Sequence, residues 1–225
     1  DADGRTPVGY DIDIITAVGA VLGLEVVIES ADFPAIIPAL GSKYDVGISS
    51  FTITTERMAE ANMVSYFNAG EAFSVQKGNP KDVDPANICG LTVAVQTGTV
   101  EDEGADEISS TCVEDGEQPL EVLRYDNQAD ATTNLVGGKA DIMYADSPIV
   151  SYAIEQTNGE IEQIGDVFDS APQGIVTAKA DTELAAAIQA ALTVLMEDGT
   201  FTDILASWGN DAGALDESVV NPPVS

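Results

Sequence analysis

One stretch of this sequence, Ser49-Ser50-Phe51-Thr52-Ile53-Thr54-Thr55-Glu56-Arg57, decides how the rest of the chain is interpreted. It follows the apolar segment Val46-Gly47-Ile48 and holds one of only three arginines in a chain with 39 acidic and 8 basic residues. A guanidinium group offers a planar set of donors that fits a carboxylate, and nearby hydroxyl and N–H groups can complete such a site. A surface arginine paired with Glu56 or Glu60 explains the same residues. The stretch alone leaves both interpretations open.

The composition indicates a globular and strongly acidic protein. The formal net charge is -31 at pH 7, and a surface of this charge repels nucleic acid and anionic lipid, so neither is expected as a partner. The 225 residues suffice for one or two domains, and no run of about 18 apolar residues predicts a membrane span. The acidity suits work outside the cell or in saline surroundings, and simple solubility explains it equally.

The few cysteines and the absence of histidine limit the possible chemistry. With two cysteines and no histidine, neither a structural zinc site nor a Cys/His nucleophile is expected, and no metal or cofactor is predicted. A disulfide between Cys89 and Cys112 is favoured over two free thiols. Such a bond would stabilise the protein by about 3 kcal/mol and indicate an oxidising compartment.

Strand-like and helix-like segments alternate along the chain, which predicts an α/β fold. Residues 10–22 carry apolar side chains at helical spacing and end at Gly23. The other expected helices are 34–41, 99–110, 128–136, 147–156 and a long helix from 181 that stops at Gly199, followed by an amphipathic segment at 201–208 and an unstructured tail at 221–225. The expected strands are 24–28, 46–49, 73–76, 91–95, 121–125, 140–144 and 174–178.

Two segments resemble each other, residues 40–50 and residues 135–146. Each is typical of a helix end, a Gly-containing turn with a lysine, and then a strand. Two similar α/β lobes would explain the match, and so would chance, because such turns are common. In the alignment Ser50 corresponds to Asp146, each at the carboxyl end of a strand, where open α/β sheets bind ligands.

A second segment favours binding of an anion. The expected strand at 91–95 leads into Gln96-Thr97-Gly98-Thr99-Val100-Glu101-Asp102, where Thr99 and Asp102 form a capping-box pattern. A helix that begins there points free N–H groups and its positive dipole end at a ligand. Asp146 precedes Ser147-Pro148, so it either starts a helix or binds a cation. An arginine, a helix N-terminus and a carboxylate together match an α-amino acid.

Several motifs, in order and at matching spacing over nearly the whole chain, resemble those of family 3 extracellular solute-binding proteins, the polar amino-acid receptors of ABC importers. The motifs are Gly9-Tyr10-Asp11-Ile12-Asp13-Ile14, Asp32-Phe33 with Ile36 to Leu40, Ser50 to Arg57, Val93 to Thr99, Ala140-Asp141, Asp146-Ser147-Pro148, and Asp198-Gly199-Thr200-Phe201 with Trp208-Gly209.

This resemblance implies a two-lobed periplasmic-binding-protein-like fold of type II, with two hinge strands near residues 67–71 and 170–174. Lobe one would comprise residues 1–68 and 173–225, and lobe two residues 69–172. Family members carry a strand and an aromatic loop ahead of Gly-Tyr-Asp, whereas eight residues precede Gly9 here. We therefore expect lobe one to lack its first strand. The resemblance also favours the Cys89–Cys112 disulfide.

The resemblance assigns expected ligand contacts residue by residue. Arg57 would bind the ligand carboxylate and Asp146 its ammonium group. The remaining ligand-binding residues would be Phe33 as an apolar wall, Ser49, Ser50 and Thr52 beside Arg57, Gln96 toward the ligand side chain, and Thr99 and Val100 at the helix start. A neutral polar amino acid is the preferred ligand, because no further basic or acidic group is evident for a charged side chain.

The function implied is a non-catalytic, monomeric receptor that delivers an amino acid to an ABC importer permease. We expect it outside the cytoplasm, in the periplasm or held on the outer face of the membrane by an N-terminal lipid anchor. The alternative is an enzyme on the same fold, similar to cyclohexadienyl dehydratases, with Glu101, Asp146 or another carboxyl group of the cleft as general acid. A sensory domain is a third possibility.

Overall fold

The computed structural model describes residues 6–224 and divides the chain into two compact units. Unit 1 comprises Asp1–Ala31, Ala35–Asn68 and Ala171–Ser225, and unit 2 comprises Asp32–Pro34 and Ala69–Ser170. The helices are α1 (Tyr10–Leu22), α2 (Phe33–Ala39), α3 (Thr55–Glu60), α4 (Val100–Glu114), α5 (Gln128–Val136), α6 (Ser147–Gln156), α7 (Thr182–Glu197), α8 (Thr200–Ser207) and the 3-10 turn η1 (Asp211–Gly213). The strands are β1 (Val46–Thr52), β2 (Ala61–Gln76), β3 (Thr92–Gln96), β4 (Glu121–Tyr125), β5 (Ile142–Asp146) and β6 (Ile161–Ala178).

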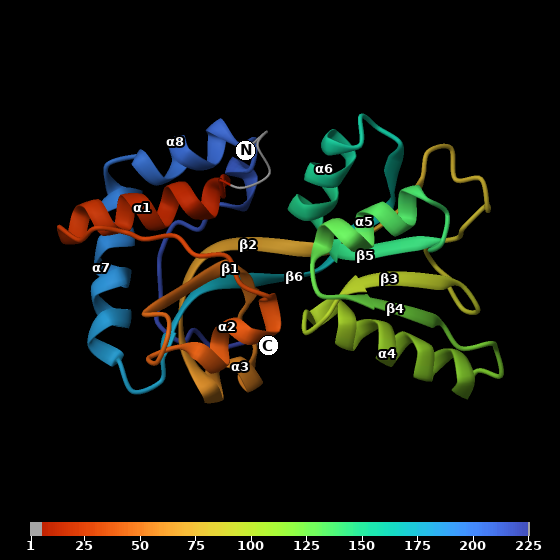
Figure 1. Ribbon diagram of the computed structural model, residues 1–225, viewed down its shortest axis with the longest axis horizontal. Helices are drawn as coiled ribbons and strands as arrows, with labels where there is room; N and C mark the ends of the chain where they lie inside the picture. The colour runs from red at the N-terminus through yellow and green to blue at the C-terminus, as the bar shows by residue number, and fades with distance from the viewer. Residues whose placement is uncertain (1–5, 225) are drawn as a thin grey trace. The chain divides into compact units, whose positions relative to one another are not determined.

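In unit 1, helix α1 packs against α7, α8 and β1 (Figure 1). It begins after Gly9 and ends at Gly23, whose φ of 69° is a left-handed conformation that glycine adopts at low cost. The buried side chains Ile14, Ile15 and Val18 form its inner face. Helix α7 contributes a matching row of buried residues, namely Ala185, Ile188, Ala191, Leu192 and Leu195.

In unit 2, β3 lies between β4 and β5 and pairs with both in parallel, while β2 pairs with β5 antiparallel. Alternate residues face opposite sides of this sheet, which builds two cores. Ala94, Met143 and Ala145 pack with Leu135 of α5 on one side. On the other side, one cluster of buried residues contains Val93, Val95, Ile142 and Tyr144 from the strands and Ala105 from α4. The expected disulfide between Cys89 and Cys112 is present.

Two long strands belong to both units. β2 passes from unit 1 to unit 2 after Asn68, and β6 returns to unit 1 after Ser170. Hydrogen bonding links the strands in the order β1-β6-β2-β5-β3-β4. Within β2 nearly every residue is buried, which hides the period-2 pattern that identifies strands in a sequence. Local sequence patterns predict only residues 73–76 of β2 and 174–178 of β6, and the family resemblance adds hinge strands near residues 67–71 and 170–174.

The α/β fold predicted from the sequence is confirmed, and most helices lie within a few residues of their expected bounds. The strand expected at 24–28 is wrong, since these residues form neither helix nor strand. Among residues 6–224, no described strand pairs with this segment, and a strand needs a hydrogen-bonded neighbour. Helix α3 was not predicted at all. Across the described residues, no helix is both long and apolar enough to span a bilayer.

Candidate functional site: the polar ends of β1 and β5

In unit 1 the end of β1 has an unusual backbone at Ser50. Its φ of 48° is in the left-handed region, which is uncommon for a residue other than glycine. The pairing of β1 with β6 changes register between Gly47 and Phe51, so Ser50 lies in an irregular part of the strand. Backbone strain of this kind persists only where surrounding contacts hold it, and it is often found at functional sites.

The carboxylate of Asp11 holds this strand end. Its Oδ2 accepts a hydrogen bond from Ser50 N at 3.1 Å, and its Oδ1 accepts one from the buried Tyr66 hydroxyl at 2.6 Å. The Tyr10 hydroxyl lies 2.9 Å from Ser50 Oγ. Burial raises the pKa of Asp11 to about 6, although the hydrogen bonds from Tyr66 and Ser50 oppose the rise. Asp11 is therefore mainly ionised at neutral pH and can accept both bonds.

Arg57 lies on α3, directly after β1. Thr54 begins this helix by accepting a hydrogen bond from Arg57 N at 3.1 Å, which is a regular N-cap. The guanidinium Nη1 donates to Thr52 O at 2.8 Å, and the group lies 5.8 Å from the centre of the Phe51 ring. These contacts hold the guanidinium beside the end of β1. Such a group is suited to bind a carboxylate.

In unit 2 the loop after β3 begins α4 as the sequence predicts. Asp102 N donates to Thr99 Oγ1 at 3.2 Å, and Asp102 Oδ2 accepts from Gly98 N at 3.0 Å. Thr99 is thus the N-cap, and Val100 is the first residue of the helix. Gln96 ends β3, where its Nε2 donates to Asp126 O at 3.2 Å.

Asp146 is the last residue of β5 and occupies the N-cap position of α6, but its side chain makes no capping hydrogen bond. On the neighbouring strand β2, Glu71 is its direct partner in the antiparallel register. Side chains of such a pair lie on the same face of the sheet, so two carboxyl groups occur at this strand end.

The carboxyl group of Glu71 lies in a partly buried environment with negative charges nearby. Its carboxyl accepts a hydrogen bond from the Tyr144 hydroxyl. Burial raises the pKa of Glu71 to about 8, and the negative charges of Glu101, Asp169 and Glu107 contribute. Glu71 is therefore mainly protonated at neutral pH, and Glu101 beside it is buried in the first turn of α4.

The structure thus brings the expected ligand-binding residues together in two groups, one in each unit. Ser49, Ser50, Thr52 and Arg57 lie at the end of β1 and the start of α3. Gln96, Thr99, Val100 and Asp146 lie at the ends of β3 and β5 and the start of α4. Phe33 is buried at the start of α2, in the short piece 32–34 that belongs to unit 2.

Sequence reasoning did not assign roles to Asp11, Tyr66 and Glu71. Asp11 and Tyr10 stand in the Gly-Tyr-Asp motif, so their position in that motif was an available signal. Tyr66 and Glu71 lie within β2, and nothing in their local sequence separates them from ordinary strand residues. Only the pairing of distant segments shows that each supports a strand end.

The sequence matches, over residues 1–211, the family described as bacterial extracellular solute-binding proteins, family 3. The chain belongs to this family. The family resemblance drawn from the motifs, and the two-lobed fold class that goes with it, are therefore confirmed.

Two relatives and one solved structure illustrate the similarity. The arginine-binding protein ArgT of Corynebacterium glutamicum is 35% identical over 98% of this chain and 73% of its own length. The glutamine-binding protein GlnH of an ABC transporter of Bacillus subtilis is 30% identical over 89% of this chain and 72% of its own. An ancestral arginine-binding protein bound to arginine superposes with a TM-score of 0.84 at 32% identity, covering 93% of this chain and 91% of that one. All three are binding proteins by name.

Proposed function

We propose that this protein binds a free amino acid outside the cytoplasm and delivers it to an ABC importer, without catalysis. Arg57 supports this proposal most directly, since its guanidinium is fixed by Thr52 O at the end of a strand whose backbone is strained at Ser50. In the proposal, Arg57 binds the ligand carboxylate together with the hydroxyl and N–H groups of Ser50 and Thr52.

The proposal assigns the other end of the amino acid to unit 2. Asp146 would bind the α-ammonium group, while Thr99 and Val100 would donate from the start of α4. Asp146 suits this role because it places a carboxyl group at the end of β5, on the same face of the sheet as Glu71. Phe33 and Gln96 remain proposed contacts to the ligand side chain, and the division into two lobes at β2 and β6 remains a proposal for how the protein closes.

The identity of the ligand side chain is the finer part of the proposal. The sequence predicts a neutral polar side chain, and the relatives named for arginine and for glutamine add one basic and one neutral candidate. Glu71 bears on this choice, because its raised pKa of about 8 leaves it mainly uncharged at pH 7. At that pH it does not supply a second negative charge beside Asp146, which supports the neutral ligand.

Isothermal calorimetry with glutamine and with arginine tests both the receptor function and the proposed neutral side chain of the ligand. We expect saturable binding of glutamine, recovered unchanged, and weaker binding of arginine. Tighter binding of arginine, accompanied by proton release in buffers of different ionisation enthalpy, would show that Glu71 ionises beside a basic ligand and would overturn the neutral assignment. Turnover of the ligand would overturn the receptor.

Two substitutions test the roles of the charged residues. Arg57→Ala should abolish measurable binding, and Asp146→Asn should weaken it about hundredfold, because each leaves a ligand charge without its partner. Lys77→Ala is the control for the loss of a positive charge, since Lys77 is exposed and lies outside the proposed ligand contacts. Binding by Arg57→Ala at the affinity of the unmodified protein would refute the carboxylate assignment.

A membrane anchor and the permease complete the proposal. A lipid anchor ahead of the described residues and a monomeric state are inferences from the family. They are checked by mass spectrometry of the protein isolated from its native membrane and by light scattering.

A further inference from the structure

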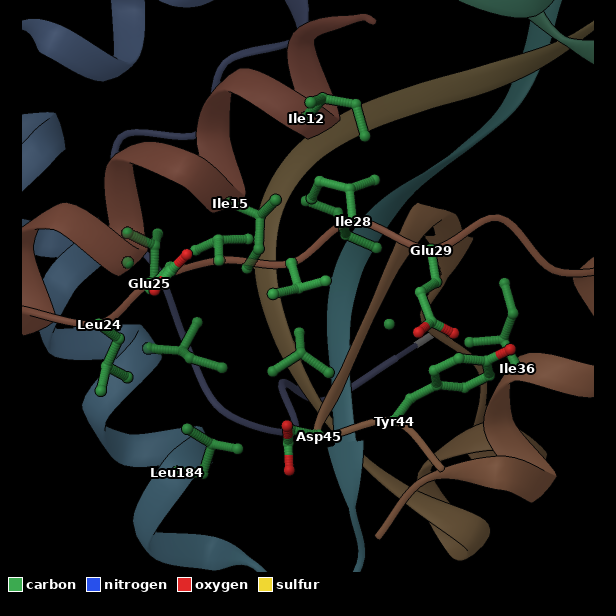
Figure 2. A pocket seen from close by; sticks show the side chains of 18 of the residues that line it. Ile12, Ile15, Leu24, Glu25, Ile28, Glu29, Ile36, Tyr44, Asp45 and Leu184 are labelled. Atoms are coloured by element: carbon green, nitrogen blue, oxygen red, sulfur yellow. The ribbon is translucent and has the colours of Figure 1, made fainter. Parts of the chain in front are cut away.

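Hollow space and polar contacts lie in different parts of the molecule. Unit 1 has a groove of about 620 Å³, bounded by α1, residues 24–29, the start of β1 and α7. Figure 2 shows mainly aliphatic side chains around it, among them Ile12, Ile15 and Leu184. None of the proposed ligand contacts lines this groove. A polar network that does reach the proposed contacts lies in unit 2, around Arg124.

Arg124 is one of the three arginines of the chain and lies on β4. Its Nε donates to Asp102 Oδ1 at 2.7 Å, and its Nη2 donates to Asp106 Oδ2 at 2.6 Å. The two carboxylates stand four residues apart on α4, so that one planar guanidinium can bond to both. Arg124 thus joins β4 to the first turns of α4.

Asp102 connects this guanidinium to the loop that carries proposed ligand contacts. Its second carboxylate oxygen, Oδ2, accepts a hydrogen bond from Gly98 N at 3.0 Å, and its own N–H donates to Thr99 Oγ1 at 3.2 Å. The Thr99 hydroxyl in turn donates to Gln96 O at 2.9 Å. The Asp102 carboxylate is therefore shared between a side chain of β4 and the backbone of the loop.

The conformation of this loop decides which groups it can offer to a ligand. Because the Thr99 hydroxyl donates to Gln96 O, the donors that remain at the helix start are backbone N–H groups, which have no partner within the helix. Gly98 precedes them with a φ of 78°, a left-handed conformation. The hydrogen bond from Gly98 N to Asp102 holds that conformation, and it therefore also fixes the direction of the N–H groups that follow.

The acidic start of α4 works against this arrangement. The first turn holds three acidic residues, and Asp106 follows one turn after Asp102. Like charges four residues apart repel each other on a helix. Arg124 bonds to both of these carboxylates, so it offsets their repulsion and keeps Asp102 turned toward the loop.

The exposure of the three side chains distinguishes this network from a simple surface ion pair. Asp102 is 14% exposed, Arg124 39% and Asp106 65%. A pair as exposed as Arg124 and Asp106 contributes little to stability. Solvent screens the bond to the more buried Asp102 less, and this is the bond that leads to the loop.

We propose that Arg124 is a positioning residue of the ligand site, which holds Asp102 and, through it, the N–H groups at the start of α4 in the orientation that binds the amino acid. The inference rests on the proposed function for the nature of the ligand, whereas the effect of Arg124 on the loop does not. Two of the three arginines would then serve the site, Arg57 by contact with the ligand and Arg124 without contact.

Calorimetric titration of the whole chain with glutamine tests the effect on binding. Arg124→Ala should weaken binding about tenfold with little change in melting temperature, because the loop loses its fixed orientation while the core is unchanged. Arg124→Lys keeps the charge but not the planar fork, so it should recover part of the affinity. When Asp102→Ala is already present, Arg124→Ala should have no further effect, because the contact between Arg124 and the loop is already lost.

Lys81→Ala is the matched control. Lys81 pairs with Asp141, whose Oδ2 accepts a hydrogen bond from Thr92 N at 2.9 Å, so a cation, a carboxylate and a backbone N–H are arranged in the same way. This pair lies at the start of β3, whereas the proposed contact Gln96 lies at its end. Lys81→Ala should leave the affinity for glutamine unchanged. An equal loss of affinity in Arg124→Ala and Lys81→Ala would overturn the proposal, by assigning the effect to net charge.

Amide hydrogen exchange of the ligand-free protein tests the loop independently of the proposed function. Arg124→Ala should speed exchange at Gly98 at least tenfold and leave Thr92 unchanged, and Lys81→Ala should do the reverse. Unchanged exchange at Gly98, or binding of glutamine by Arg124→Ala at the affinity of the unmodified protein, would overturn the inference. Faster exchange at Gly98 in a protein that binds no amino acid would refute the proposed function while confirming that Arg124 holds the loop.

Discussion

The two strand ends that carry the proposed ligand contacts are each supported by a carboxyl group and a tyrosine, yet the two carboxyl groups differ in charge. In unit 1 Asp11 accepts hydrogen bonds from Tyr66 and from Ser50 N. In unit 2 Glu71 accepts a hydrogen bond from Tyr144. Burial raises the pKa of both, but to about 6 for Asp11 and to about 8 for Glu71.

The difference follows from what surrounds each group. Two donors face Asp11 and favour its ionised form, which offsets part of the cost of burial. Three further carboxyl groups, Glu101, Asp169 and Glu107, act on Glu71 and favour its protonated form. At neutral pH the Asp11–Tyr66 pair therefore carries a negative charge and holds the backbone at Ser50. The Glu71–Tyr144 pair is neutral and hydrogen-bonded. A carboxyl group and a tyrosine thus serve a different purpose at each strand end.

The largest expected effect on stability comes from removing the Asp11 carboxylate in unit 1. Asp11→Ala leaves Ser50 N and the buried Tyr66 hydroxyl without their acceptor, which should lower the free energy of unfolding by about 2–4 kcal/mol. Urea denaturation at pH 7 measures the change. Asp203→Asn, at an exposed position on α8, is the control and should leave stability within about 0.5 kcal/mol. A loss of under about 1 kcal/mol for Asp11→Ala would show that Asp11 does not hold the strand end.

A smaller effect on stability is expected when Glu71 in unit 2 is replaced by a residue that does not titrate. The folded protein holds the Glu71 proton with a pKa of about 8, against an ordinary value of 4.5, so the free energy of unfolding should fall as the pH rises between these values. Glu71→Gln keeps an uncharged hydrogen-bonding group and should remove this fall. Since Glu71 is partly exposed, solvent reduces the effect, and we expect a gain of about 2 °C in melting temperature at pH 9.

Calorimetric melting curves at pH 6 and pH 9 check this prediction. The gain from Glu71→Gln should be larger at pH 9 than at pH 6, because only part of the fall in stability has occurred at pH 6. Glu103→Gln serves as the control, because it lies in the first turn of α4 and is exposed. An equal gain at both pH values would mean that protonation of Glu71 is not its cause.

The smallest change in stability is expected at Ser50. Ser50→Gly relieves a backbone with φ of 48° but removes the hydroxyl that lies 2.9 Å from Tyr10. These effects oppose each other, so the free energy of unfolding should change by less than about 1 kcal/mol. Ser50→Ala lacks the relief and should be the less stable of the two in thermal melts. If Ser50→Ala is the more stable variant, the left-handed backbone is not strained.

Local sequence signals predicted much of the fold and part of the site. Gly23 and the Thr99–Asp102 pair mark helix boundaries through contacts within four residues, and the structure has both. The segment at 24–28 has the composition of a strand, but a strand also requires a neighbour, which local composition does not report. The charge of Glu71 depends on Glu101, Asp169 and Glu107, which come close only in the folded chain.

The similarity between residues 40–50 and 135–146 also predicts local structure but not the contacts made with distant segments. Both segments do form a helix end, a turn and a strand, as the pattern predicts. Their ends differ in ways that the pattern does not contain, because Ser50 lies in an irregular part of β1 while Asp146 ends β5 in regular pairing with Glu71. Distant partners on β6, α1 and β2 decide these details.

The division of the chain at β2 and β6 has a consequence for how each unit folds. Apart from residues 32–34, unit 2 is one continuous stretch from Ala69 to Ser170, and its disulfide lies within that stretch. Unit 1 needs β6, α7 and α8, which follow that stretch in the chain. Most contacts of unit 2 are therefore made within one segment, whereas the first half of unit 1 has to find a partner on the far side of that segment.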